Sequence, residues 1–141
     1  MTQPERYQLD QNIQRAARQI WVTFQRVGFH RYPAAETDPT LADVSYLAQR
    51  HRHLFKFRVS IDVWHQDRDI EFHQFLNYCE SLFNNQSIEI DYRSVEMLAD
   101  DLYTQLVQRY PGRSMTIEVN EDGECGCSVV YPAFATLGEC C

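Results

Sequence analysis

The stretch HLFKFRVSIDVW, residues 53–64, decides the fold. Its apolar and polar side chains alternate without a break, and successive side chains of a β-strand point to opposite faces of a sheet. One face is formed by Phe55, Phe57, Val59, Ile61 and Val63, and the other by Lys56, Arg58, Ser60 and Asp62. We therefore predict a strand that buries its apolar face and leaves its polar face in water.

Further elements are predicted on both sides of this strand. Residues 19–25 alternate in the same way and indicate an earlier strand. From residue 71 the apolar spacing becomes helical, and a second helix is expected from Ser94, its N-cap, to a stop at Pro111-Gly112. Residues 115–119 and 127–131 then predict two strands joined by Asp122-Gly123, a typical hairpin turn.

The predicted order of elements is β-β-α-α-β-β. Strands that pair with their neighbours, with helices grouped between them, favour an α+β fold in which a four-stranded antiparallel sheet carries two helices on one face. We expect a polar N-terminal segment over residues 1–18, a single domain over 19–131 and a tail over 132–141. Because such a sheet has two free edges, we also expect copies of the chain to associate edge to edge as a homo-oligomer.

Composition narrows the classes of partner. The chain has 141 residues and a formal net charge of −7, which argues against general binding of nucleic acid or of an anionic membrane surface. The sequence contains no apolar run long enough to cross a membrane, and its N-terminus lacks the apolar stretch of a signal peptide. The five cysteines are an odd number, so we expect free thiols and a cytoplasmic protein.

A candidate metal site stands at the start of the long strand. His51 and His53 are alternate residues, so their imidazoles share one face and can bind the same ion. His30 ends the preceding strand and is the natural third ligand, and three histidines with one open position are typical of catalytic zinc. A polar strand end without a metal is the simpler interpretation of a His-x-His pair taken alone.

Several short motifs occur in an order that resembles the 6-pyruvoyltetrahydropterin and 6-carboxytetrahydropterin synthase family. The resemblance covers roughly residues 20–131, and the motifs that carry it are GFH (28–30), HRHLF (51–55), IEF (70–72), RSVEMLA (93–99) and IEVNE (117–121). The resemblance implies the T-fold, zinc bound by His30, His51 and His53, and Glu121 as the carboxylate that anchors a pterin ring. Two carboxylate oxygens suit the adjacent amino group and ring N–H of a pterin or guanine. Without the resemblance, Glu121 is a solvated residue before a turn.

The sequence departs from this family where its proton-transfer groups are expected. Leu47 stands four residues before His51, at the position of the family's usual catalytic cysteine, and leucine transfers no proton. The short segment over residues 84–91 has no counterpart of the family's Asp-His pair. Cys79 lies on an apolar helical stripe and is expected in the core, while His73 is expected at the surface. Cys125 and Cys127 are interpreted as packing residues or an edge thiol.

Arg52, Lys56 and Arg58 form a basic cluster on one face of the long strand, with Arg50 beside it. Two interpretations are open. The cluster is either a solvated face that balances the acidic residues, or a site for a phosphate or carboxylate beside the metal.

The function expected from these observations is binding of a pterin- or purine-nucleotide-type small molecule on a synthase-like scaffold, without the standard synthase reaction. A short similarity to small proteins of tailed phages, over residues 44–57 and 67–72, suggests sequestration of a nucleotide signal in a host cytoplasm. The alternatives are a divergent zinc-dependent lyase or synthase acting on a pterin or a guanosine-triphosphate-derived substrate, and a structural or protein-interaction domain.

Overall fold

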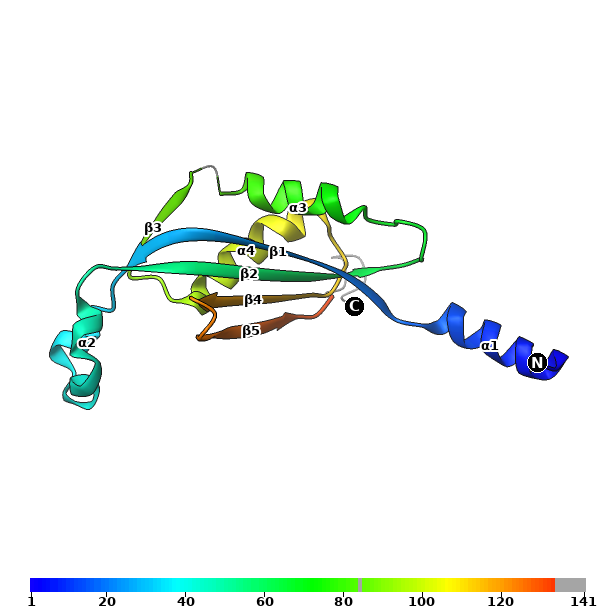
Figure 1. The fold of residues 1–141 in the computed structure, drawn as a ribbon, viewed down its shortest axis with the longest axis horizontal. Coiled ribbons are helices and arrows are strands. Elements are labelled where there is room, and N and C mark those ends of the chain that lie inside the picture. The colour runs from blue at the N-terminus through cyan, green and yellow to red at the C-terminus, as the bar shows by residue number, and fades with distance from the viewer. Residues whose placement is uncertain (84, 134–141) are drawn as a thin grey trace, which may run out of the picture.

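The computed structural model describes residues 1–83 and 85–133 (Figure 1). Asn84 and the residues 134–141, which include Cys140 and Cys141 and most of the predicted tail, lie outside the described residues. The elements in chain order are α1 (Gln3–Arg15), β1 (Arg18–His30), α2 (Ala34–Thr37), the 3₁₀ segment η1 (Pro39–Ala48), β2 (His51–Val63), α3 (Phe72–Ser81), β3 (Ser87–Asp91), α4 (Val95–Arg109), β4 (Met115–Glu121) and β5 (Cys125–Tyr131).

The sheet has five strands in the order β3-β1-β2-β4-β5 and is mixed, so the prediction of a four-stranded, wholly antiparallel sheet is wrong because it lacks one strand, which is parallel. The four predicted strands do pair antiparallel, with β1 and β2 matched over their whole length from Arg18↔Val63 to His30↔His51. The additional strand β3 runs parallel to the end of β1. Its sequence SIEID alternates, but five residues after a turn-like segment were too short a signal to separate from a loop.

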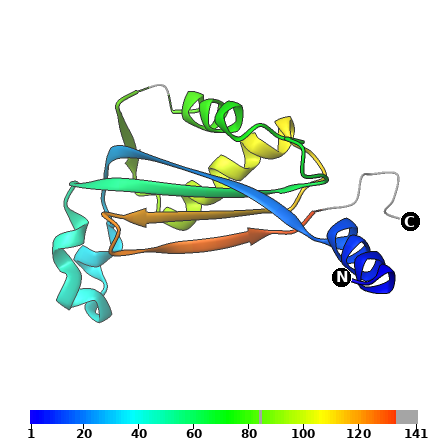
Figure 2. The ribbon, with the colours of Figure 1, turned by 45° about the vertical axis from the view of Figure 1, so that its right-hand side comes forward.

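The core lies between one face of the sheet and the helices α3 and α4, which Figure 2 shows on the same side of the strands. The alternation predicted for β2 is confirmed, because Phe55, Val59 and Ile61 are fully buried while Arg58 on the opposite face is exposed. The same alternation continues along β1, β2 and β4, so every second side chain faces the core up to the end of each strand. These core-facing rows end in His30 on β1, His51 and His53 on β2, and Glu121 on β4.

A close contact between β1 and β2 explains a glycine near this end of the sheet. A Cβ placed on Gly28 would lie 2.6 Å from ring atoms of Phe55 and 2.8 Å from Ile88. Phe55 is fully buried and cannot move aside. Gly28 therefore lets the Phe55 ring fill the space directly behind the two histidines nearest to it, His30 and His53.

Two segments extend beyond the sheet at opposite ends (Figure 1). The polar N-terminus forms α1, which begins with a capping box between Thr2 and Glu5 and buries none of its residues. At the other end, the connection between β1 and β2 contains α2 and η1. The backbone N–H of Tyr32 donates to the carbonyl of Leu47 across this connection, at 2.7 Å, and so closes it into a compact flap.

None of the helices in the described ranges combines the length and the apolar character that a membrane crossing needs.

Candidate metal centre

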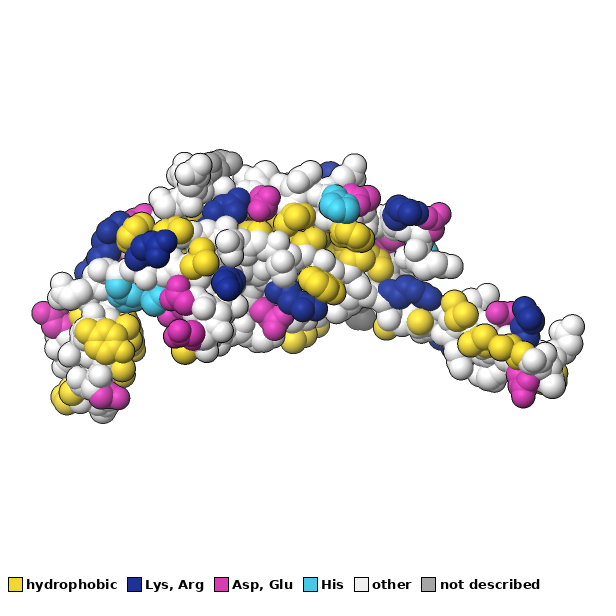
Figure 3. All heavy atoms as spheres, viewed as in Figure 1, with side chains coloured by type: hydrophobic (Ala, Val, Ile, Leu, Met, Phe, Trp, Pro, Cys, Tyr) yellow, Lys and Arg dark blue, Asp and Glu magenta, His cyan; other side chains and the backbone are white. Residues whose placement is uncertain are grey.

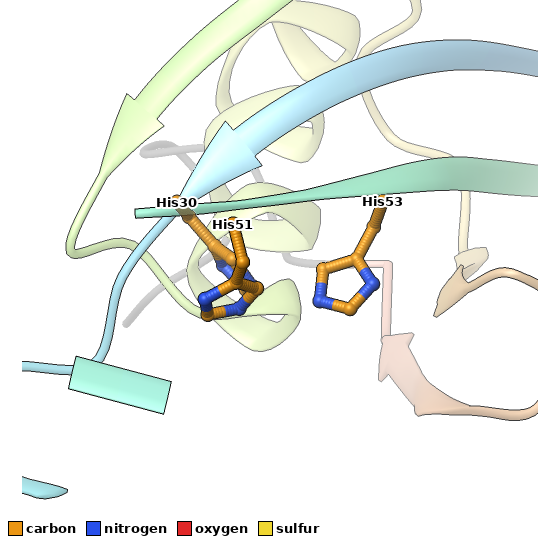
Figure 4. Close-up of side chains that lie close together, drawn as sticks. All are labelled: His30, His51 and His53. Carbon is orange, nitrogen blue, oxygen red and sulfur yellow. The ribbon is translucent and has the colours of Figure 1, made fainter. Parts of the chain in front are cut away.

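The three predicted ligands come together where β1 ends and β2 begins. His30 and His51 are paired across the two strands, and His53 lies two residues further along β2 on the same face. The ring centroids are 4.6 Å apart for His30 and His51, 5.1 Å for His30 and His53, and 4.8 Å for His51 and His53. Figure 4 shows all three imidazoles on one side of the strands. One ring nitrogen from each lies within 4.8 Å of the others, close enough to bind one metal ion.

Each of the three rings has an acceptor at Nδ1. His30 Nδ1 lies 3.1 Å from the carbonyl oxygen of Arg93, and His51 Nδ1 lies 2.7 Å from that of Gln49. His53 Nδ1 lies 2.7 Å from a carboxylate oxygen of Asp122. A carbonyl or carboxylate only accepts, so Nδ1 must donate and the lone pair of each neutral ring is on Nε2. Fixing the tautomer in this way is how proteins orient histidines that bind metals through Nε2.

Asp122 is an oriented acceptor, held by the turn between β4 and β5. One of its carboxylate oxygens accepts from His53, and the other accepts from the backbone N–H of Leu54 at 2.8 Å. The Leu54 N–H, followed by His53, holds the pKa of Asp122 below its usual range. Asp122 therefore stays ionised and keeps the His53 ring in position.

Glu121 lies against the opposite side of the cluster. Its Oε1 is 3.2 Å from His30 Nε2 and its Oε2 is 3.3 Å from His53 Nε2. Hydrogen bonding to Glu121, opposed by burial and helped by the Arg93 carbonyl, raises the pKa of His30. The same hydrogen bond to His30 lowers the pKa of Glu121, although its own burial opposes the shift. Without a metal, the pairing with Glu121 thus favours the protonated form of His30.

The donor set fits a metal ion. His53 Nε2 is buried and has no hydrogen-bond partner, since its approach to Glu121 does not have the geometry of a hydrogen bond. An orphaned buried nitrogen is costly unless something binds it. Three imidazole nitrogens with one neighbouring carboxylate are ligands that zinc and other first-row transition metals accept.

A pocket of about 390 Å³ adjoins the cluster and gives it access to solvent. It is bounded by His30, His51 and Glu121, by Leu47 of the flap, and by Tyr92 and the start of α4. The two arginines in its wall are already paired, Arg31 with Asp91 at 2.8 Å and Arg93 with Asp101 at 2.7 Å. The pocket therefore has the histidine cluster on one side and apolar side chains on another. Its two arginines are neutralised by their ion pairs, so it offers little positive charge to a ligand.

The predicted basic residues lie elsewhere. Arg52, Lys56 and Arg58 project from the opposite face of β2 to His51 and His53. Lys56 and Arg58 line a separate hollow of about 580 Å³ on that face, where Arg58 lies 3.5 Å from Glu118 and stacks on Trp21 at 4.2 Å. The structure thus brings Glu121 to the three histidines and keeps the three basic residues away from them. Their role in ligand binding stays a prediction.

The two remaining histidines lie outside the cluster. His73, expected at the surface, has an exposed side chain beside Glu71, and His65 lies in the turn after β2 beside Asp69. Figure 3 shows histidine side chains next to acidic side chains at the flap end of the molecule.

The sequence analysis did not predict a role for Asp122 at the site, because an Asp-Gly pair between two strands is already accounted for as a hairpin turn. The sequence signal that could have pointed to Asp122 is its position directly after Glu121, the predicted carboxylate of the site.

Metal binding is expected to weaken as the pH falls. The raised pKa of His30 means that the metal-free site binds a proton more tightly than a free histidine does. Its pairing with Glu121 stabilises the metal-free fold below the pKa of the unfolded chain, and this contribution is lost as pH rises through the raised pKa. A metal ion bound through His30 would compete with that proton, so its apparent affinity should fall steadily from about pH 8 to about pH 6.

The measurement is a competition titration against a chromophoric chelator at several pH values. Calorimetry in two buffers with different ionisation enthalpies then counts the protons released per metal. An affinity that does not change over this range, with no proton released, would contradict the site as described.

Comparison with known proteins shows a likeness in structure but none in sequence. No protein family matches the chain, and no curated protein matches it. The fold is similar to the crystal structure of an uncharacterized protein from Wolinella succinogenes, with a TM-score of 0.55 and 13% sequence identity. The alignment covers 82% of this chain and 98% of that chain. At this identity the likeness shows the α+β fold alone.

Proposed function

We propose that this chain is a zinc-binding protein on a scaffold of the 6-pyruvoyltetrahydropterin synthase type. In this proposal it uses the metal and the pocket beside it to bind a pterin- or purine-like small molecule, without the standard synthase reaction. The observation that carries the proposal is the arrangement of the three histidines. Each Nδ1 faces an acceptor, and each Nε2 is left available to one ion.

Zinc is the metal proposed because neutral imidazoles suit it and its sites with three histidines keep a position for an exogenous ligand. When bound, zinc would polarise a ligand oxygen. The chain's own contribution is orientation, since Arg93, Gln49 and Asp122 fix the rings before any metal arrives. Such preorganisation lowers the cost of assembling the site.

The pocket supports a flat heterocyclic ligand. Tyr32 and Tyr92 contribute aromatic surface to its wall, and Glu121 lines it beside the histidines. A carboxylate can accept two hydrogen bonds from an amino group and an adjacent ring N–H, as on a pterin or guanine. The volume of about 390 Å³ is in the range of small-molecule pockets.

The wall of the pocket supports binding rather than the family's proton transfers. Leu47 lines it on the flap side, where the resemblance expects a cysteine. Cys79 is sealed in the core, where burial raises the pKa of its thiol to about 12. The thiols of Cys125 and Cys127 belong to β5 and are not part of the pocket wall. Leucine can shape a binding site but cannot act as an acid or base.

The first test is the metal content of the chain, purified without a histidine tag. Elemental analysis should find about one zinc per chain after dialysis. If the protein takes up no zinc even when it is offered in excess, the proposal fails, and a structural or protein-interaction role becomes the better explanation.

The second test separates binding from catalysis. The zinc-loaded chain is titrated by calorimetry with neopterin, guanosine and guanosine triphosphate, and each mixture is then analysed for products. Saturable binding to at least one of them without turnover is the expected result. Turnover would replace this proposal with a divergent zinc-dependent lyase or synthase. If none of the three compounds binds, the proposal that the ligand is a pterin- or purine-like heterocycle is rejected.

A further inference from the structure

We propose that Glu121 is the fourth ligand of the metal when no small molecule is bound. This inference rests on the metal centre proposed above and assigns Glu121 a role that the resemblance does not. There Glu121 anchors a ring, whereas here its carboxylate contacts the nitrogens that would hold the ion.

The distances are those of neighbouring ligands around one ion. In a tetrahedral site with bonds of about 2.0–2.1 Å, ligand atoms stand roughly 3.3–3.4 Å apart. Glu121 Oε1 lies 3.2 Å from His30 Nε2, and Oε2 lies 3.3 Å from His53 Nε2. The carboxylate thus already stands at a ligand's distance from two of the three histidines, with the ligand nitrogens of the three rings themselves within 4.8 Å.

The chemistry of the four groups also requires a cation among them. The acceptors at Nδ1 direct the Nε2 lone pairs of His30 and His53 toward carboxylate oxygens, which carry lone pairs of their own. Two such acceptors at this distance repel unless a proton or a metal ion lies between them. Among the described residues, no Lys or Arg forms an ion pair with Glu121, although its side chain is only 28% exposed. A metal ion would satisfy the carboxylate and both nitrogens together.

The position of Glu121 is fixed by the sheet. Its Cα is paired with that of Phe55 across β2 and β4, and Phe55 fills the space behind His30 and His53. The turn that begins at the next residue is held to Leu54 through Asp122. Glu121 therefore reaches the cluster without any rearrangement of the backbone.

This role has a consequence for the ligand. A small molecule that coordinates the metal through an oxygen atom must displace the carboxylate or expand the coordination number. Displacement would release Glu121 just as an N–H edge arrives to be bound. The same carboxylate would then serve first as a metal ligand and later as the ring anchor.

The test uses cobalt(II) in place of zinc, because its visible absorption reports the number and kind of its ligands. Wild-type chain, Glu121→Gln and Glu121→Ala are loaded with cobalt and titrated with azide, a small anion that needs an open position. The matched control is Glu118→Gln. Glu118 lies on the same strand, faces the opposite side of the sheet and pairs with Arg58. Circular dichroism and thermal melting verify that each variant folds.

We expect wild type and Glu118→Gln to bind cobalt equally and to change their spectra little with azide. Both Glu121 variants should bind cobalt roughly 100-fold more weakly, the upper end of the 10- to 100-fold loss seen even for residues behind the ligands. They should also take up azide with a large spectral change. Equal affinity and equal azide uptake in wild type and both Glu121 variants would overturn this inference while leaving the metal centre intact. No cobalt binding by wild type would overturn both.

Discussion

The His53→Ala variant is expected to bind zinc at least about 100-fold more weakly than the wild-type chain. His53 supplies a buried Nε2 that has no hydrogen-bond partner, and its loss would leave two histidines and the carboxylate of Glu121 to hold an ion. Removing a residue behind a ligand already costs about 10- to 100-fold, so removing a ligand should cost at least the upper value. Affinity is measured by competition with a chromophoric chelator, and bound zinc by elemental analysis.

The control for this experiment is His73→Ala. His73 has an exposed side chain on α3 and contacts Glu71, away from the cluster. It should bind zinc as tightly as wild type. A loss of zinc in His73→Ala equal to that in His53→Ala would mean that surface histidines hold the metal. Retention of wild-type affinity by His53→Ala would remove this residue from the site.

The Phe57→Ala variant is expected to lose about 3–5 kcal/mol of unfolding free energy, the usual cost of truncating a buried aromatic ring. Phe57 is 2% exposed and stacks on Phe24 with ring centroids 4.8 Å apart and planes 5° apart. Its ring centroid also lies 5.1 Å from that of Phe83. Truncation would leave a cavity at the centre of these three rings, which the surrounding sheet cannot close.

Urea unfolding followed by tryptophan fluorescence measures this effect. Phe72→Ala is the matched control, because Phe72 is 51% exposed and its truncation should cost less than about 1 kcal/mol. Both variants should bind zinc with wild-type affinity while they remain folded. A cost for Phe57→Ala no larger than that of the control would show that the three rings do not form the core as described.

The parts of the fold that could be predicted are those with a strong period. β2 was recognisable because five apolar residues alternate with four polar ones, and α4 because Ser94 and Pro111-Gly112 mark its two ends. β3 gave only five alternating residues, too few to distinguish a strand from a loop. The helix α1 buries nothing, so it lacks the apolar stripe by which a helix is recognised.

In the candidate site, too, the residues that follow from strand periodicity could be predicted and those that depend on loops could not. The shared face of His51 and His53 follows from their spacing on a strand, and His30 follows from the pairing of β1 with β2. The same period places Arg52 and Lys56 on the other face, which is why the basic cluster does not join the three histidines. The acceptors from Gln49, Arg93 and Asp122 depend on the path of loops and turns, which no local pattern specifies.

Two of the three contacts that orient the histidines join distant parts of the chain. His30 is held by a carbonyl 63 residues away, and His53 by a carboxylate 69 residues away. An unfolded chain cannot present these groups together, so a metal ion held by the three histidines would bind the folded form and draw the folding equilibrium toward it. At a free metal concentration about 100 times the dissociation constant, this linkage is worth about 2.7 kcal/mol. The supply of metal in the cell would therefore set how much of this protein persists as well as how much of it is loaded.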